Sequence, residues 1–245
     1  MTVREALKGF KTISLHDVEK ENLMDRVDTK YVVSTPALLS FLEGAWDRYA
    51  ALSIDGETMM AYSSRYFDTE ENRMYLDHQR GKRTRQKIRI RRYAANGDAF
   101  MEIKSKTNRG ATSKRRLPMK PGETLEDYTL FIEENSFYKT ADLHETLRVS
   151  FDRITLMDAG QRERITVDTN LEFHNPTTGQ TLALGDVAVI EWKRSGAAAD
   201  SPLKTLLRDL RIKPRGFSKY CIGMAMTDPS LRQNRLKEKI RALRQ

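Results

Sequence analysis

The stretch that decides the fold is Arg85-Gln86-Lys87-Ile88-Arg89-Ile90-Arg91-Arg92-Tyr93. Isoleucines alternate with cations, so a β-strand here points Ile88 and Ile90 to one face and Lys87, Arg89 and Arg91 to the other. Taken alone, this pattern is most simply an exposed antiparallel strand with a solvated basic face. Several strands of the same kind would instead enclose a cationic cavity.

Other segments repeat this division into an ionic and an apolar face. Glu102 and Lys104 share one face of a predicted strand, and Glu191 and Lys193 share one face of another. Asn96-Gly97 is a strong signal for a two-residue hairpin after the opening strand. The alternation predicts eight strands, the opening one included. They lie at residues 26–33, 59–66, 85–93, 100–106, 112–117, 147–153, 164–169 and 187–194.

Helix signals lie between these strands. Ser34-Thr35-Pro36 is typical of a helix start, as is Ser201-Pro202. We expect one domain over residues 1–245, with residues 1–24 as a helical lead-in and 228–245 as a C-terminal helix. That last helix could pack against the sheet, plug an opening or dock on a partner. The helices are predicted at residues 14–24, 36–46, 70–79, 121–135, 201–210 and 228–244, and residues 216–220 are predicted as a basic loop or strand.

The composition indicates a polyanionic partner. The formal charge is +9, hydrophobic residues make up 39% and charged residues 31%, and the mean hydropathy is -0.64. Such a charge suits nucleic acid, an anionic membrane surface or a phosphate-rich small molecule. No run is long enough to span a membrane and no apolar signal core is present, so a cytoplasmic location is expected.

Other residue types narrow the choice. The single cysteine, Cys221, excludes an internal disulfide and is expected to be a small buried residue, and the four histidines show no zinc-type spacing. The aromatic side chains lie beside apolar strand positions and are expected in the core, so a nucleic-acid partner lacks its stacking platform. These aromatic residues are Tyr31, Tyr66, Phe67, Tyr93 and Tyr220.

The cations fall on many separate segments. Strands with one ionic face, wrapped by helices, predict an α+β fold with an antiparallel barrel whose interior is charged. Such an interior needs a polyanion to compensate the repulsion and desolvation of its cations. The cations in question are Lys30, Arg89, Arg91, Lys104, Lys114, Arg153, Arg164 and Lys219.

Carboxylates among these cations allow two interpretations. Glu191, and more weakly Glu102 and Glu172, could form ion pairs or hold a divalent metal that bridges phosphate oxygens. Asp68 and Asp168, near predicted strand ends, are expected to cap turns. Phosphoryl transfer needs positioning and charge neutralisation rather than a nucleophilic triad, which suits a chain without a Walker loop or a dinucleotide fingerprint.

The ordered set of motifs resembles the VTC domain, the polyphosphate polymerase domain of the triphosphate tunnel metalloenzyme (CYTH-like) superfamily. The resemblance runs from about Asp25 to Met224. It is carried by Arg26-Val-Asp-Thr-Lys30-Tyr31, Tyr66-Phe67-Asp68-Thr69, Lys87-Ile-Arg89-Ile-Arg91, Glu102-Ile-Lys104, Arg153, Arg164-Ile-Thr-Val-Asp168, Val189-Ile-Glu191-Trp-Lys193 and Ser218-Lys219-Tyr220.

The resemblance implies an eight-stranded antiparallel tunnel that binds ATP with Mn²⁺ or Mg²⁺ and transfers the γ-phosphoryl group to a growing polyphosphate chain. It implies ATP and polyphosphate as partners, no nucleic acid, and a membrane-protein partner for polymer export, the chain itself not being transmembrane. Its site residues would be catalytic Lys30, Arg89, Arg91, Lys104, Arg153, Arg164 and Lys219, phosphate-binding Lys114, Lys193 and Ser218, and metal-binding Glu191 with Glu102 as a secondary ligand.

One departure favours the polymerase. The hydrolytic relatives begin with Glu-x-Glu-x-Lys, whereas this chain has Arg26-x-Asp28-x-Lys30. Fewer acidic ligands suit a long polyanion better than a two-metal site that activates water. A tunnel triphosphatase acting on inorganic triphosphate or nucleoside triphosphates stays an alternative, as does a non-catalytic polyphosphate-binding module.

Overall fold

The computed structural model describes residues 1–18, 26–108, 112–158, 163–195 and 201–243. The chain forms two compact units. The first comprises Met1–Ala61, Phe151–Leu171 and Leu184–Phe217, and the second comprises Tyr62–Ser150, Glu172–Ala183 and Ser218–Gln245. The single domain expected from the sequence stays a prediction.

The strands of the first unit form an antiparallel set in the order β2 (Arg26–Ser34), β11 (Val187–Ser195), β9 and β8. Strands β8 (His144–Asp158) and β9 (Glu163–His174) each contribute one part to this unit and the rest to the second. β3 (Tyr49–Ser53) pairs with β8, and β1 (Lys11–Ser14) pairs with β3 in parallel.

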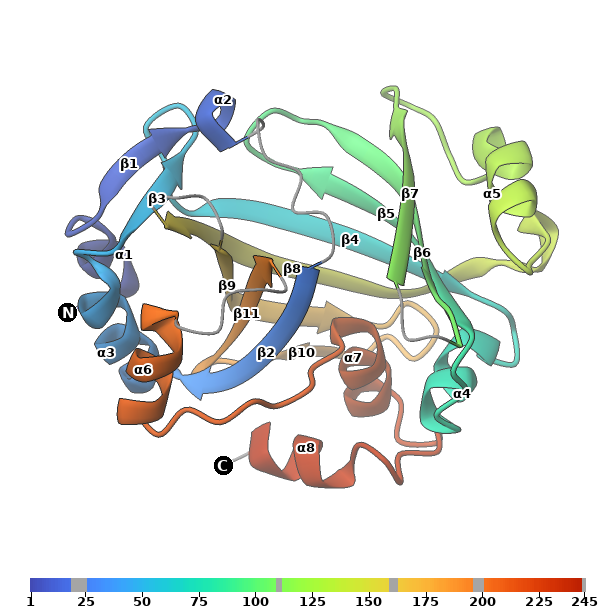
Figure 1. The fold of residues 1–245 in the computed structure, drawn as a ribbon. Coiled ribbons are helices and arrows are strands. Elements are labelled where there is room, and N and C mark those ends of the chain that lie inside the picture. The colour runs from blue at the N-terminus through green and yellow to red at the C-terminus, as the bar shows by residue number, and fades with distance from the viewer. Residues whose placement is uncertain (19–25, 109–111, 159–162, 196–200, 244–245) are drawn as a thin grey trace. The chain divides into compact units, whose positions relative to one another are not determined.

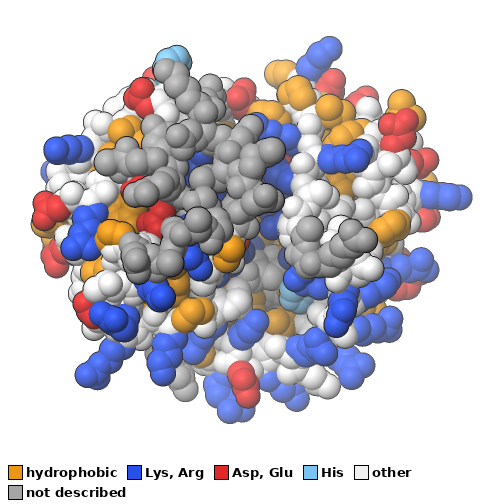
Figure 2. All heavy atoms as spheres, in the orientation of Figure 1, with side chains coloured by type: hydrophobic (Ala, Val, Ile, Leu, Met, Phe, Trp, Pro, Cys, Tyr) orange, Lys and Arg blue, Asp and Glu red, His pale blue; other side chains and the backbone are white. Residues whose placement is uncertain are grey.

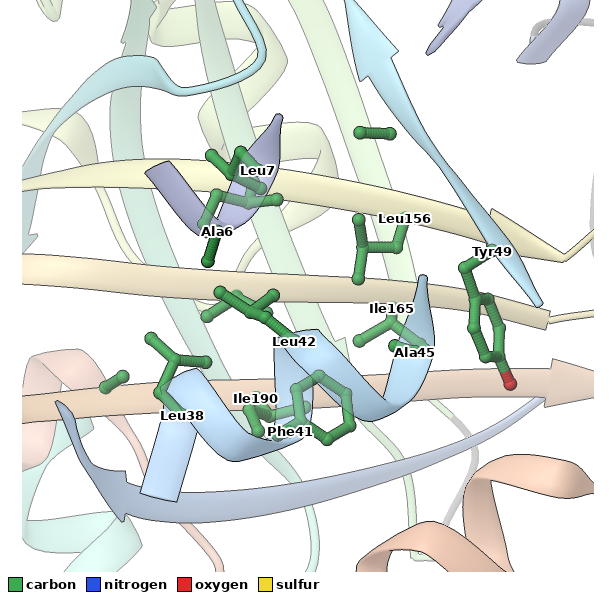
Figure 3. Packing of buried hydrophobic residues seen from close by; sticks show 14 of the residues in the cluster. Ala6, Leu7, Leu38, Phe41, Leu42, Ala45, Tyr49, Leu156, Ile165 and Ile190 are labelled. Carbon is green, nitrogen blue, oxygen red and sulfur yellow. The ribbon is translucent and has the colours of Figure 1, made fainter. Parts of the chain in front are cut away.

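Helices cover the apolar face of these strands. They are α1 (Val3–Leu7), α3 (Thr35–Ala45) and α6 (Pro202–Asp209), and α3 contacts both α1 and α6 (Figure 1). The short helix α2 (Leu15–Val18) contacts β1 and β3 instead. Leu38, Phe41 and Leu42 of α3 are fully buried, and Figure 3 shows them packed with Ile165 and Ile190 from β9 and β11. The predicted packing of helices on the apolar strand face is therefore confirmed in this unit.

The second unit contains the opening strand of the sequence, β5 (Arg85–Tyr93). Its strand order is β8, β4 (Met60–Asp68), β5, β6 (Ala99–Lys106) and β7 (Thr112–Met119), and β10 (Thr181–Ala183) pairs with β9 (Figure 1). Ile88 lies opposite Ile103 and Ile90 opposite Met101, and all four are at most 2% exposed. One face of β5 and β6 is therefore apolar and buried, as the alternation predicts.

Helices of the second unit are α4 (Arg73–Gln79), α5 (Thr129–Asn135), α7 (Lys219–Thr227) and α8 (Lys237–Leu243), with 3-10 turns at Glu126–Tyr128 and Thr140–Asp142. α7 is buried on nearly all sides. A Cβ atom on its Gly223 would lie 2.6 Å from atoms of both Leu147 and Phe173, so only glycine permits this close approach. Ile240 of α8 is 5% exposed, so one side of this helix is buried, and its role stays a prediction.

All eight predicted strands are present, and the α+β class with an antiparallel sheet is confirmed. Three short strands, β1, β3 and β10, were not predicted. Among the described residues β2 pairs along its length only with β11, and β7 only with β6, so the strand order is open rather than a ring of eight.

Several predicted boundaries are wrong. The β5–β6 connection spans residues 94–98 instead of a two-residue turn, although Gly97 does adopt a positive φ of 74°. The predicted loop or strand at 216–220 leads into α7, and the C-terminal helix begins at Lys237 rather than 228. Of the helix predicted at 14–24, α2 covers Leu15–Val18, and residues 19–25 lie outside the described part. Within the described residues, no helix combines the length and the apolar character that a membrane crossing requires.

Candidate functional site

The ionic face of the second unit is formed by β5, β6 and β7. We call it the lysine–arginine face and define it by Lys87, Arg89, Arg91, Glu102, Lys104 and Lys114. Cross-strand register places Lys87 opposite Lys104, and Lys104 opposite Lys114, so three lysines form one row across three strands. Like charges directly opposite each other destabilise a sheet. This row therefore concentrates positive charge on one face of the three strands.

Glu102 is the carboxylate placed among these cations, and it is 1% exposed. Its Oε2 accepts from Nε of Arg89 at 2.7 Å and lies 2.5 Å from NH2 of the same guanidinium, while its Oε1 pairs with Nζ of Lys114. Burial alone would raise the pKa of Glu102, but Arg89, Arg91 and Lys114 together lower the pKa to about 2. Glu102 is thus ionised and engaged by two cations, an arrangement that suits the ion-pair interpretation.

Arg89 also contacts an aromatic residue of the neighbouring strand. Its NH1 donates to the hydroxyl of Tyr66 at 3.0 Å, and its Cζ lies 5.7 Å from the centre of that ring. Tyr66 stacks on Tyr220 with ring centres 5.2 Å apart, and the Tyr220 hydroxyl donates to Asp68 at 2.6 Å. Burial alone would raise the pKa of Tyr66, but Arg89, Arg91 and Lys87 lower the pKa to about 8.

The sequence assigned Tyr66 to the core with the other aromatic residues. Tyr66 is buried as expected, at 4% exposed, but its hydroxyl belongs to the lysine–arginine face. The sequence signal for this contact is the alternation of β4, because the register places Tyr66 directly opposite Arg89. Of the remaining aromatics, Tyr31, Phe67 and Tyr220 are buried, and Tyr93 is half-buried against Phe100.

Arg91 is the most enclosed cation of this face, at 8% exposed. Its Nε donates to Oγ of Ser64 at 3.4 Å, and its Cζ lies 5.9 Å from the centre of the Tyr62 ring. Both contacts come from β4, the strand that pairs with β5. Since Tyr66 of β4 also contacts Arg89, this strand contacts both arginines of the opening motif.

Ser218 joins the lysine–arginine face to α7. Its Oγ accepts from Nζ of Lys87 at 2.7 Å and from the backbone N–H of Cys221 at 3.2 Å, so it caps the helix. Lys219, the first residue of α7, is half-buried beside it. Cys221 is fully buried, which confirms the sequence prediction for this residue.

A second ionic face lies in the first unit. We call it the glutamate face and define it by Lys30, Arg153, Arg164, Asp168, Glu191 and Lys193. Register places Glu191 between Lys30 and Thr166, and Lys193 between Asp28 and Arg164. Cations and carboxylates are thus interspersed on this face, although Lys193 lies opposite the like-charged Arg164.

Glu191 is half-buried, with Lys193 beside it on the same strand and Thr166 opposite it on β9. Its Oε2 lies 3.8 Å from Nζ of Lys193 on the same strand, with both side chains 15% exposed. Across the strand pair, Oγ1 of Thr166 is buried without a hydrogen-bond partner. Lys30 donates from Nζ to the carbonyl oxygen of Phe217 at 3.1 Å.

The two aspartates expected to cap turns behave differently. Asp68 accepts from the backbone N–H groups of Thr69, Met74 and Tyr75 at 2.8–2.9 Å, so its capping role is confirmed. For Asp168 the prediction is wrong, because this residue lies within β9 and binds Arg153 through both carboxylate oxygens. Sequence spacing gave no signal for a pair that forms between two strands.

The predicted site residues therefore fall into two groups. Arg89, Arg91, Lys104, Lys114, Ser218, Lys219 and Glu102 belong to the second unit, and Lys30, Arg153, Arg164, Lys193 and Glu191 to the first. Glu172, the weaker carboxylate candidate, is exposed on β9. The described residues contain no cluster of three or more His, Cys, Asp or Glu side chains that could hold a metal. Lys and Arg side chains are spread over the face drawn in Figure 2.

Comparison with known proteins decides the family. Residues 25–227 match the family model of the VTC domain. The chain belongs to the VTC domain family. This match begins and ends within a few residues of the ordered motifs that resemble the family. No curated protein matches this VTC domain chain in sequence.

Solved structures support the same fold class. A proposed adenylate cyclase from Bacillus halodurans has a TM-score of 0.52 at 12% identity, over 80% of this chain and 96% of its own. A proposed adenylyl cyclase from Hippeastrum, described as having a dominant triphosphatase activity, has a TM-score of 0.51 at 14% identity, over 83% and 97%. This VTC domain thus shares its fold with these two proteins.

Proposed function

We propose that this VTC domain is a metal-dependent polyphosphate polymerase that uses ATP. The observation that carries the proposal is the row of Lys87, Lys104 and Lys114 beside Arg89 and Arg91, with Glu102 as the carboxylate among them. Lysines opposite each other repel, and a chain of linked phosphates, with one negative oxygen or more at each unit, would compensate this repulsion. Membership of the VTC family supports the same substrate class.

In the proposed reaction, an oxygen at the end of polyphosphate forms a new bond to the γ-phosphorus of ATP. The bond between that phosphorus and the β–γ bridging oxygen breaks, and ADP leaves with the electron pair. The protein needs to align the two reactants and neutralise charge on the transferring group. Arg89 and Arg91 are assigned to the transferring phosphates, with Lys30, Lys104, Arg153, Arg164 and Lys219 as further catalytic cations and Lys114, Lys193 and Ser218 as phosphate-binding residues.

Glu191 is the residue assigned to Mn²⁺ or Mg²⁺. A substrate-bridging divalent ion is commonly held by one or two carboxylates together with phosphate oxygens and water. Glu191 fits this role because its carboxylate is half-buried, and because the buried Thr166 hydroxyl opposite it has no hydrogen-bond partner. The ion would supply charge neutralisation at the phosphate oxygens. Glu102 is left as an ion-pair partner of Arg89 and Lys114.

Two other functions would use the same cations. A triphosphatase would transfer the phosphoryl group to water, the activity for which the Hippeastrum protein is described. A non-catalytic binding module would hold polyphosphate without any transfer. The hydrolytic relatives begin with Glu-x-Glu-x-Lys, and here Arg26 replaces the first glutamate whereas Asp28 keeps a carboxylate at the second position. The loss of one acidic ligand favours polymer binding over a two-metal hydrolytic site.

The test is to incubate the purified full chain with ATP and Mn²⁺ and to measure ADP, orthophosphate and acid-labile polymer. The proposal expects polymer and ADP in parallel, and loss of both in Arg89→Ala and Glu191→Gln. Arg92→Ala is a matched control, because Arg92 is exposed on the same strand and alternation places it on the other face. Orthophosphate without polymer would replace the polymerase by a triphosphatase. Polyphosphate binding that survives Glu191→Gln without any turnover would leave a binding module.

The cellular setting is part of the proposal. A polymerase that consumes ATP is expected in the cytoplasm, and export of its polymer would require a separate membrane-protein partner. Neither expectation affects the assignment of the site residues.

A further inference from the structure

The contacts of Arg89 determine how a phosphate could approach it. A guanidinium carries five N–H donors. Arg89 uses Nε and one N–H of NH2 on Glu102, and one N–H of NH1 on Tyr66. Two N–H groups of Arg89 remain for a ligand, and the side chain is 18% exposed. Paired N–H groups on one guanidinium are suited to bidentate phosphate binding.

Tyr66 is itself held rigidly. Its ring stacks on Tyr220 at an interplanar angle of 24°, and Tyr220 is fixed by its hydrogen bond to Asp68. Asp68 is fully buried and accepts three backbone N–H groups around the start of α4. The position of the Tyr66 hydroxyl is therefore fixed by buried residues of the second unit.

We propose that Tyr66 is a positioning residue for phosphate binding: its hydroxyl holds the Arg89 guanidinium from the side opposite to Glu102, so that the remaining N–H groups are presented to the phosphate chain. This inference rests on the proposed function for the identity of the ligand. It extends that function by adding a residue that acts through Arg89 and makes no contact with the reacting atoms.

The hydroxyl also connects phosphate binding to pH. Near pH 8 Tyr66 loses its proton, because the surrounding cations lower its pKa to about 8. An ionised Tyr66 would neutralise part of the positive charge that attracts phosphate. The charged groups that act on it directly are Lys87, Arg89 and Arg91 on β5, and Tyr220 on α7 stacks on its ring. Glu102 on β6 contacts Arg89, Lys114 on β7 contacts Glu102, and Asp68 on β4 contacts Tyr220.

The test measures binding of inorganic tripolyphosphate to the full chain by calorimetry, without metal, at pH 6.5 and pH 9. Tyr66→Phe removes the hydroxyl and keeps the ring. It is expected to bind about tenfold more weakly at the lower pH, because one hydrogen bond that orients a charged group is lost. The wild-type protein should lose affinity between the two pH values by a larger factor than Tyr66→Phe. Titration of the ligand itself is the same for both proteins and cancels in this comparison.

Two further variants separate positioning from general destabilisation. Tyr128→Phe removes a hydroxyl bonded to the Pro118 carbonyl oxygen in the same unit and should bind as the wild type does. In an Arg89→Ala background, Tyr66→Phe should have no additional effect on binding, since Tyr66 acts through Arg89. The tyrosinate absorbance of the wild type should show an ionisation near pH 8 that Tyr66→Phe lacks.

The outcomes are distinct. Wild-type affinity and an unchanged pH dependence in Tyr66→Phe would overturn the inference and leave the proposed function intact. Weaker binding in Tyr66→Phe by a protein that makes no polymer would support the positioning role and remove the polymerase proposal. A wild-type protein that binds tripolyphosphate neither without metal nor with Mn²⁺ would overturn both.

Discussion

Arg153 donates two hydrogen bonds to Asp168, from Nε to Oδ1 at 2.6 Å and from NH2 to Oδ2 at 2.9 Å. The Asp168 side chain is 2% exposed and that of Arg153 is 12% exposed. The pair is therefore bidentate and largely desolvated, which fixes the plane of the guanidinium. A surface ion pair would not impose such an orientation.

Asp168→Asn is expected to lower the free energy of unfolding by about 1–3 kcal/mol, because one charge-assisted contact of a buried arginine is lost. Tripolyphosphate affinity should fall as well, since Arg153 is no longer held in one orientation. Urea unfolding and calorimetry would measure the two effects. Asp152→Asn is the control, because Asp152 is half-buried on β8 and accepts only from the exposed Asn170 among the contacts shown. Equal effects in both variants would contradict the special role of the Arg153–Asp168 pair.

Glu102 predicts how stability depends on pH. Its pKa in the folded protein is about 2, below the ordinary value of 4.5. A carboxylate with a lowered pKa contributes stability that is fully present above its unfolded pKa and is lost as the pH falls toward the folded value. The contribution is on the order of 3 kcal/mol at neutral pH. Glu102→Gln should therefore flatten the loss of stability between about pH 5 and pH 2.

Urea unfolding across that pH range would measure this slope. Glu134→Gln, at an exposed position on α5, serves as the control and should keep the wild-type slope. A Glu102→Gln protein with the wild-type slope would show that Arg89 and Lys114 do not hold Glu102 in its ionised form.

Ser218 combines a structural and a binding role that can be separated. Ser218→Ala removes both the helix cap and the acceptor for Lys87, so it should lower stability by about 1 kcal/mol and also change tripolyphosphate affinity. Ser201 caps α6 through the N–H of Leu203. Ser201→Ala should therefore give a similar loss of stability without any change in binding. If both variants bind tripolyphosphate like the wild type, Ser218 is a cap alone.

The sequence predicted those features that depend on local alternation. In β5 and β6 the period-2 pattern identified both the strands and their faces, because side chains there alternate between a buried and an ionic side. The Glu-x-Lys pattern of β11 likewise placed Glu191 on the ionic face. These predictions needed no information about distant parts of the chain.

Features that depend on tertiary pairing were missed. β1 and β3 are short and pair residues 11–14 with residues 50–53, a partnership that neither segment signals alone. α7 has buried residues on nearly every side, including Tyr220, Cys221 and Met224, so it lacks the polar face that marks a surface helix. The role of Asp168 was mispredicted for the same reason, because its partner Arg153 lies on another strand. The burial of Tyr66 was predicted correctly, but its contact with Arg89 on the neighbouring strand was missed.

Glu191→Gln tests the metal assignment directly. Mn²⁺ affinity, measured by calorimetry with tripolyphosphate present, should fall about tenfold or more when the carboxylate is lost. Tripolyphosphate binding without metal should be unchanged or stronger, because a negative charge near Lys30 and Lys193 has been removed. Glu172→Gln is the matched control, since Glu172 is an exposed carboxylate on β9. If Mn²⁺ affinity survives Glu191→Gln and metal-free binding weakens, Glu191 acts by positioning Lys30 or Lys193 rather than by binding the metal.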